Sequence, residues 1–144
     1  MSLLADRVIG TWRLTSREDR TSTGELRLEP GLGQDPIALL IYDRGGNFAA
    51  QFMKRDRTGF IAAGPASNNS TAVGGYDAYF GKYKVDEVSG AVTQTLEAAL
   101  SPGNVGMVVT RGLQVEGNTL IIRLKTNALD GTPVERTLRW MRAA

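Results

Sequence analysis

The chain has no cysteine and no histidine among its 144 residues. Without cysteine it has no disulfide bond, no thiol nucleophile and no thiolate-bound zinc. Without histidine it has no imidazole metal ligand and no catalytic triad of the kind that needs an imidazole base. Its Asp and Glu residues do not follow the spacing of a calcium-binding loop. The sequence therefore predicts no metal site and no cofactor.

Long apolar runs and charge of one sign are also missing. No run approaches the length of about 20 apolar residues that spans a bilayer. The N-terminal MSLLADRV has neither a basic leader nor an apolar stretch of signal-peptide length. Lys and Arg total 17 against 15 Asp and Glu, for a net charge of +2, and the one basic cluster, at residues 54–57, contains its own acid. The composition predicts a cytoplasmic protein that inserts into no membrane and binds no nucleic acid.

What the sequence does contain is a regular succession of strand-like runs and turns. The length suits one domain over residues 1–144. We predict eight strands, at residues 8–17, 36–43, 47–54, 77–86, 91–100, 105–116, 119–126 and 133–142. Residues 2–8 predict a short N-terminal helical turn, and part of 66–76 also has helical character. Because hairpins join most of the strands, we favour an all-β, eight-stranded antiparallel up-and-down barrel over the alternative of a two-sheet sandwich.

Two tight turns predict which side chains point into this barrel, because a slip of one residue would invert every face. A two-residue turn at Gly117–Asn118 pairs Glu116 with Thr119. Strand alternation then predicts the inner face of the preceding strand: Met107, Val109, Arg111, Leu113 and Val115.

The turn at residues 87–90 extends this inner face across two more strands. Pairing Asp86 with Ala91 predicts four opposite pairs: Tyr83–Gln94, Tyr79–Ala98, Leu96–Val109 and Gln94–Arg111. Tyr83, Gln94 and Arg111 are thereby predicted to form one row, next to Leu124.

Arg111 is the charged residue of this row, and a buried guanidinium is unfavourable unless it is paired. In one interpretation, Gln94, Tyr83, water or an acid such as Asp77 satisfies it within a polar network. In the other, it binds an anionic or carbonyl oxygen of a ligand inside the barrel. For that ligand we predict contacts with Tyr79, Tyr83, Gln94, Leu96, Val109, Arg111 and Leu124, with Trp140 adding apolar surface.

Gln51 and the segment after it depend on turns that the sequence leaves open. A two-residue turn before the third predicted strand places Gln51 on the face of Tyr42 and adds it to the predicted ligand contacts. A three-residue turn pairs Tyr42 with Phe48 and points Gln51 away. Residues 54–75, which contain GPASNNSTAVGG, predict either a mobile flap at the barrel mouth or a plain surface loop.

Several blocks of the chain are similar to one known family. They are VIGTWRL, DPIALLIYDRGGNFAAQFMKRDR, AYFGKYKVDEVSGAVTQTLEAALSPGNVG, TLIIRLKT and ERTLRWMR, and they cover nearly the whole chain in this order. Together they resemble the lipocalin-like domain family of bacteria and fungi. The most specific part is the central YFGKYKVDEVSGAVT with the PGNVG that follows it. The resemblance implies an eight-stranded, calycin-type barrel around a central cavity.

The resemblance also implies roles for residues where the barrel closes. In that superfamily the tryptophan of a Gly-x-Trp motif closes one end, and an arginine of the last strand packs over it. Gly10 and Trp12 match the motif, and Arg139 or Arg142, which flank Trp140, matches the arginine. Gly10, Trp12, Arg139 and Trp140 are therefore expected to close the barrel. The family mostly has no assigned activity, and some members occur beside enzymes of secondary metabolism. A histidine often stands in the family where this chain has Gln94, and glutamine does not titrate.

Three functions are compatible with these residues. We favour an intracellular barrel that binds a small, largely apolar or amphipathic molecule with an oxygen-bearing head group. The first alternative is an isomerase or cyclase of secondary metabolism that uses the same cavity. We rank it lower because few inner-face residues titrate, and we assign no catalytic residue. The second alternative is a filled barrel with a structural or interaction role.

Overall fold

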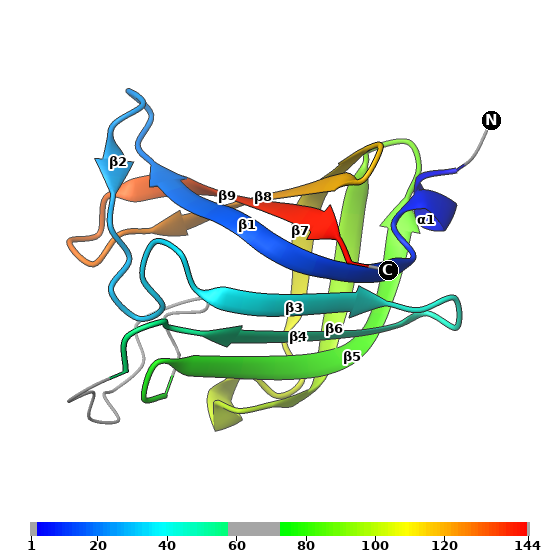
Figure 1. Cartoon of the computed structure of the whole chain (residues 1–144), viewed down its shortest axis with the longest axis horizontal. Helices are drawn as coiled ribbons and strands as arrows, with labels where there is room; N and C mark the ends of the chain where they lie inside the picture. The colour runs from blue at the N-terminus through cyan, green and yellow to red at the C-terminus, as the bar shows by residue number, and fades with distance from the viewer. Residues whose placement is uncertain (1–2, 58–72, 144) are drawn as a thin grey trace.

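The predicted strands close into a barrel. The computed structural model describes residues 3–57 and 73–143. Its elements are α1 (Leu4–Arg7), β1 (Gly10–Arg20), β2 (Leu26–Arg27), β3 (Ile37–Tyr42), β4 (Asn47–Met53), β5 (Tyr76–Asp86), β6 (Ala91–Ala99), η1 (Pro102–Asn104), β7 (Val108–Glu116), β8 (Thr119–Asn127) and β9 (Pro133–Arg142). Strands pair in the order β2-β1-β3-β4-β5-β6-β7-β8-β9, and β1 also pairs with β9. A closed, eight-stranded antiparallel barrel with one extra strand, β2, results (Figure 1), which confirms the predicted fold.

The short elements match the prediction less closely than the long strands do. The predicted N-terminal helical turn is α1, and the carboxylate of Glu87 accepts hydrogen bonds from two of its N–H groups. The sequence does not predict β2 or the 3₁₀ turn η1, because two or three residues carry no periodic signal. The helical character predicted within 66–76 falls largely outside the described residues. Its described end is a turn closed by a bridge between Val73 and Tyr76.

The two tight hairpins pair as predicted, but the longer connection between β6 and β7 does not. Gln94 pairs with Val109 instead of Arg111. The reason is that the chain after η1 turns back early, so that the Leu96 N–H donates to the Met107 carbonyl oxygen at 2.8 Å. A shift of two residues keeps the predicted inner face. Arg111 lies opposite Val92, so Tyr83, Gln94 and Arg111 do not form the predicted row.

A bulge in β6, where Glu97 is the extra residue opposite Phe80 and Gly81 of β5, is a second departure from the predicted register. The pairing of β5 with β6 shifts just before Gly81, so Tyr79 lies opposite Ala99 rather than Ala98. A Cβ atom on Gly81 would lie 1.8 Å from the carbonyl oxygen of Thr95. Only glycine therefore allows the two backbones to approach this closely.

We expect Gly81→Ala to lower the free energy of unfolding by about 1–3 kcal/mol, the usual effect of overpacking against atoms that cannot move away. Gly112→Ala in β7 is the matched control, because its Cβ would lie 3.6 Å from the nearest atom, the Arg123 carbonyl oxygen. The control is expected to be neutral or slightly stabilising. Urea unfolding measures both variants. If Gly81→Ala lowers the free energy of unfolding no more than Gly112→Ala does, the prediction is contradicted.

Trp12 closes the end of the barrel next to α1. Its ring is fully buried, and its Nε1–H donates to the Val8 carbonyl oxygen at 2.9 Å. Gly10 begins β1 with a φ of 141°, a conformation that favours glycine. The Arg142 guanidinium lies 4.2 Å from the centroid of the Trp12 ring. The arginine that packs over the tryptophan is therefore Arg142 and not Arg139, which pairs farther along β1.

Ion pairs occupy the interior toward the other end of β1. Arg17 Nη2 lies 3.0 Å from an oxygen of Glu29, which belongs to the connection between β2 and β3. Arg136 on β9 donates from Nε and Nη2 to the two carboxylate oxygens of Asp19, at 2.8 and 3.0 Å. The side chains of this second pair are 0% and 4% exposed. Each of these two arginines thus has its own carboxylate, the condition under which buried charges are tolerated.

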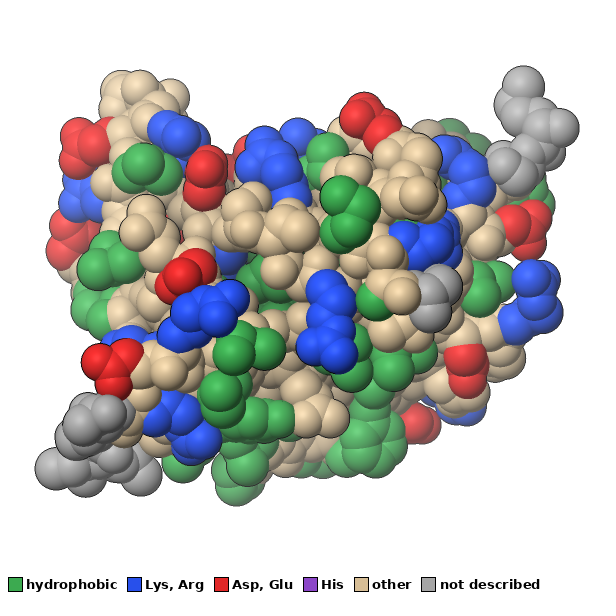
Figure 2. Space-filling model, in the orientation of Figure 1, with side chains coloured by type: hydrophobic (Ala, Val, Ile, Leu, Met, Phe, Trp, Pro, Cys, Tyr) green, Lys and Arg blue, Asp and Glu red, His purple; other side chains and the backbone are tan. Residues whose placement is uncertain are grey.

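The outer surface mixes charges and apolar side chains. Figure 2 shows Lys and Arg interspersed with Asp and Glu on the face that it draws, with apolar side chains gathered over β3 to β5. The exposed apolar residues of these strands include Ile37, Ile41 and Phe80. No helix in the described part of the chain is long and apolar enough to cross a membrane.

Candidate functional site

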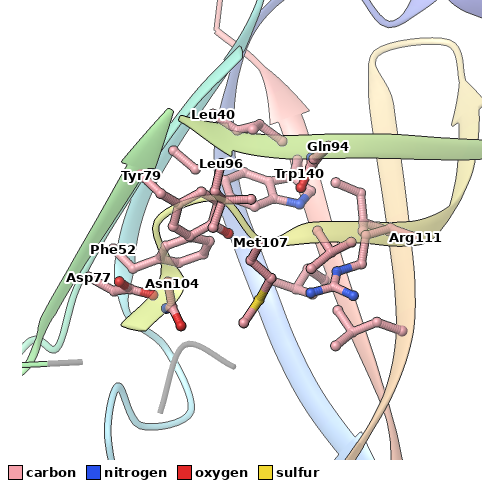
Figure 3. Close-up of a pocket in the computed structure, with 15 residues that line it drawn as sticks. Leu40, Phe52, Asp77, Tyr79, Gln94, Leu96, Asn104, Met107, Arg111 and Trp140 are labelled. Carbon is pink, nitrogen blue, oxygen red and sulfur yellow. The ribbon is translucent and has the colours of Figure 1, made fainter. Parts of the chain in front are cut away.

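A cavity lies inside the barrel beside the connection between β6 and β7 (Figure 3). Its volume is about 50 Å³. This volume has room for roughly three to five water molecules. Apolar side chains form most of the wall, among them Leu40, Phe52, Leu96, Ile122, Leu124 and Leu138. Polar groups reach the cavity from Asp77, Tyr79, Gln94, Asn104, Arg111 and Trp140.

Asp77 brings a carboxyl group into the cavity from β5. The residue is 1% exposed, and neither carboxyl oxygen has a hydrogen-bond partner among the residues that the structure describes. Burial raises the pKa of Asp77 to about 6, although the backbone N–H of Ala78 and the positive charge of Arg17 oppose the shift. At neutral pH this side chain is therefore a mostly ionised carboxylate with unused acceptor oxygens.

Arg111 lies on β7, across the cavity from Asp77 (Figure 3). Its Nη1 donates to the carbonyl oxygen of Thr110 at 3.4 Å. Burial lowers the pKa of Arg111, but a guanidinium keeps its charge at neutral pH. Met107, which is 40% exposed, lies between the two charged groups at the rim. A negative and a positive group thus face the cavity from opposite sides.

Trp140 and Gln94 supply polar atoms on the most buried side of the cavity. They are 1% and 5% exposed. Gln94 Nε2 donates to the hydroxyl oxygen of Tyr42 at 2.7 Å, and burial raises the pKa of Tyr42, so this hydroxyl stays neutral. Trp140 Nε1–H has no acceptor within the described parts of the chain. It is a buried donor that faces a cavity without a partner.

Tyr79 connects the apolar wall to the charged groups. Its ring packs against Phe48 and Phe52, with ring centroids 6.0 and 6.3 Å away. Burial raises the pKa of Tyr79, and the nearby negative charge of Asp77 raises it further. The phenol therefore remains protonated at neutral pH and is available as a hydrogen-bond donor.

Most of the predicted ligand contacts lie around this one cavity. Those that line it are Tyr79, Gln94, Leu96, Val109, Arg111 and Leu124, together with Trp140. Tyr83 is not among them. Its hydroxyl donates to the carbonyl oxygen of Asp43 at 2.6 Å, and its ring packs against Tyr42 with centroids 4.7 Å apart.

Gln51 also lies away from the cavity. The turn between β3 and β4 pairs Tyr42 with Phe48, which is the predicted outcome of the three-residue turn. Alternation along β4 then points Phe52 inward and Gln51 outward. On the outer face, Gln51 accepts a hydrogen bond from the hydroxyl of Tyr76.

Eight residues line the cavity that the sequence does not predict as ligand contacts: Leu40, Ala50, Phe52, Asp77, Asn104, Met107, Ile122 and Leu138. Asp77 precedes Tyr79 by two positions, so strand alternation alone places it on the inner face. The sequence suggests Asp77 only as an internal partner for Arg111. Phe52 depends on the turn that the sequence leaves open, and Asn104 lies in η1, where no periodic pattern applies.

The predicted flap at residues 54–75 lies mostly outside the described residues. At its described ends, Lys54 Nζ donates to the Pro30 carbonyl oxygen at 3.1 Å, and Arg57 Nε donates to that of Gly74 at 2.7 Å. No group of three or more potential metal ligands occurs in the described part of the chain.

Comparison with known proteins agrees with this architecture. A family model described as a lipocalin-like domain matches residues 9–143. The match covers all the strands, including every strand that lines the cavity. A search of curated proteins finds no match. The family model covers almost the whole chain and confirms the resemblance seen in the sequence, so the chain belongs to the lipocalin-like domain family.

Proposed function

We propose that this barrel binds a small, largely apolar molecule with an oxygen-bearing head group in its cavity. The proposal is carried by two polar groups in the mostly apolar wall, the Asp77 carboxyl and the Trp140 Nε1–H, which have no partner among the described residues. Buried polar groups in native proteins nearly always have a hydrogen-bond partner. An oxygen-bearing ligand supplies such partners where a filled barrel would leave the groups unsatisfied.

The lining of the cavity supports an amphipathic ligand rather than a purely polar one. Most of the wall is apolar, and the polar groups are few. Met107 and Val109 belong to the apolar part of the lining and offer contact to the body of the ligand.

The proposal predicts that filling the cavity abolishes binding. Three fluorescent probes carry different oxygen groups on one apolar body: 2-naphthol, 2-methoxynaphthalene and 2-naphthoate. We expect at least one of them to bind the protein, and Val109→Phe to weaken its binding at least tenfold, because the phenyl ring occupies the cavity. Fluorescence titration measures the dissociation constants.

Val108→Phe is the matched control for this experiment. Val108 is the preceding residue of β7, is 60% exposed and does not line the cavity. The same substitution at this position is expected to leave binding unchanged. The proposal is wrong if no probe binds, or if the two phenylalanine variants weaken binding equally.

A further inference from the structure

The unpaired carboxyl group of Asp77 restricts the chemistry of the ligand, provided that the proposed ligand binding is correct. Its two oxygens have no hydrogen-bond partner among the described residues, and its side chain reaches the cavity (Figure 3). An ionised carboxylate only accepts hydrogen bonds. The ligand group beside Asp77 must therefore be a hydrogen-bond donor, and a carbonyl, an ether or a carboxylate does not meet this requirement.

The charges around the cavity restrict the ligand further. Among the described residues, the positive charges that act on Asp77, Tyr79 or Arg111 are the guanidinium groups of Arg17, Arg111 and Arg136, and the carboxylates that pair with Arg17 and Arg136 are Glu29 and Asp19. The nearby hydroxyl groups of Tyr79 and Tyr42 remain neutral, because burial raises the pKa of both. With Asp77 ionised, positive and negative charges are equal in number. A charged ligand would leave a net charge in a low-dielectric interior, which is unfavourable.

From these two arguments, we propose that the ligand is electrically neutral and carries a hydroxyl group that donates a hydrogen bond to the Asp77 carboxylate. An ammonium group would donate equally well, but it would add a fourth positive charge beside the three arginines. A carboxylic acid would ionise and face Asp77 with a like charge. An alcohol or phenol on an apolar body meets both conditions. A second oxygen on that body would find a donor in Trp140 Nε1–H, which has no acceptor in the described structure.

The proposal has a pH dependence that follows from the same group. Burial raises the pKa of Asp77 to about 6, so the acceptor carboxylate is present above this pH and is lost as the pH falls below it. The preference for a hydroxyl donor is expected to be full at pH 8 and to decline at pH 5. A ligand without a donor should not show this decline.

The three naphthalene probes test the proposal because they differ only in their oxygen group. At pH 7.5, 2-naphthol is neutral and donates, 2-methoxynaphthalene is neutral and does not donate, and 2-naphthoate is an anion. A hydrogen bond to a charged group corresponds to about a tenfold gain in affinity or more. We expect 2-naphthol to bind at least tenfold more tightly than each of the other two.

Variants of Asp77 assign that preference to the carboxylate. Asp77→Leu, which is nearly isosteric and cannot accept a hydrogen bond, should remove the preference for 2-naphthol over its methyl ether. Asp77→Asn, which retains a neutral acceptor oxygen, should reduce it to a few-fold. Asp86→Asn, at the exposed end of the same strand, should leave it intact, because Asp86 does not line the cavity.

The outcomes separate this proposal from the proposed function. If the ether or the naphthoate binds as tightly as 2-naphthol and Val109→Phe blocks it, ligand binding stands and the hydroxyl proposal is overturned. A preference for 2-naphthol that survives in both Asp77 variants also overturns it. If no probe binds, both proposals fall.

Discussion

Replacing Asp19 with leucine is expected to lower the free energy of unfolding by about 3–5 kcal/mol. Asp19 accepts two hydrogen bonds from Arg136, at 2.8 and 3.0 Å, and the Arg136 side chain is 0% exposed. Without Asp19, the Arg136 guanidinium stays buried and charged but loses the carboxylate that balances its charge, which is unfavourable. Chemical denaturation of the variant measures the loss.

Two further variants establish that the loss comes from the unpaired charge. The double variant Asp19→Leu with Arg136→Met removes both charges and should recover most of the lost stability, because buried ion pairs are often replaceable by apolar pairs. Glu18→Gln breaks the exposed pair between Glu18 and Arg20, whose side chains are 34% and 48% exposed. It should cost less than about 1 kcal/mol. A loss in Asp19→Leu no larger than that in Glu18→Gln would refute the prediction.

In contrast to Asp19→Leu, Asp77→Asn is expected to raise the free energy of unfolding at neutral pH. The pKa of Asp77 rises from 3.8 to about 6 on folding because the group is buried. The folded state therefore binds the proton more tightly than the unfolded state does, and ionisation destabilises the fold. The penalty is absent below pH 3.8, grows as the pH rises, and is complete above about pH 6. By linkage it amounts to about 3 kcal/mol.

Unfolding of the wild type and of Asp77→Asn should therefore be compared at several pH values. The two proteins are expected to be about equally stable near pH 3.5 and to differ most near pH 8. Asp86→Asn is a control of opposite sign, because backbone N–H groups of Val88 and Ser89 lower the pKa of Asp86. That variant should lose stability at neutral pH and not at low pH. A stability difference for Asp77→Asn that does not change with pH would contradict a raised pKa.

A carboxylate that destabilises the fold needs a reason to be there, and ligand binding provides one. Proteins retain strained or unsatisfied groups mainly at functional sites. The sequence argues against catalysis because few inner-face residues titrate and because Gln94 does not. Asp77 changes that argument, since it is an inner-face group whose pKa of about 6 lies close to neutrality. The cavity therefore has a proton acceptor, whether or not a bound molecule is converted.

The long strands and tight hairpins were predictable because their signals are local. Alternation of apolar and polar residues has a period of two, and the turn at Gly117–Asn118 sets the register on both of its sides. The bulge opposite Gly81 and the early return of the chain after η1 are not local. They depend on how closely β6 approaches its neighbours, and no residue pattern within one strand reports that distance.

The sequence by itself determined the barrel, its inner face and the place where its ends meet. The inner face survived the register shift between β6 and β7 because a displacement of two residues preserves alternation. Only the tertiary structure decided which inner polar groups have partners. Asp19 and Glu29 pair with the buried arginines Arg136 and Arg17, while Asp77 has no hydrogen-bond partner among the described residues. Pairing depends on the stagger of strands from both ends of the chain, and that stagger exists only once the barrel has closed.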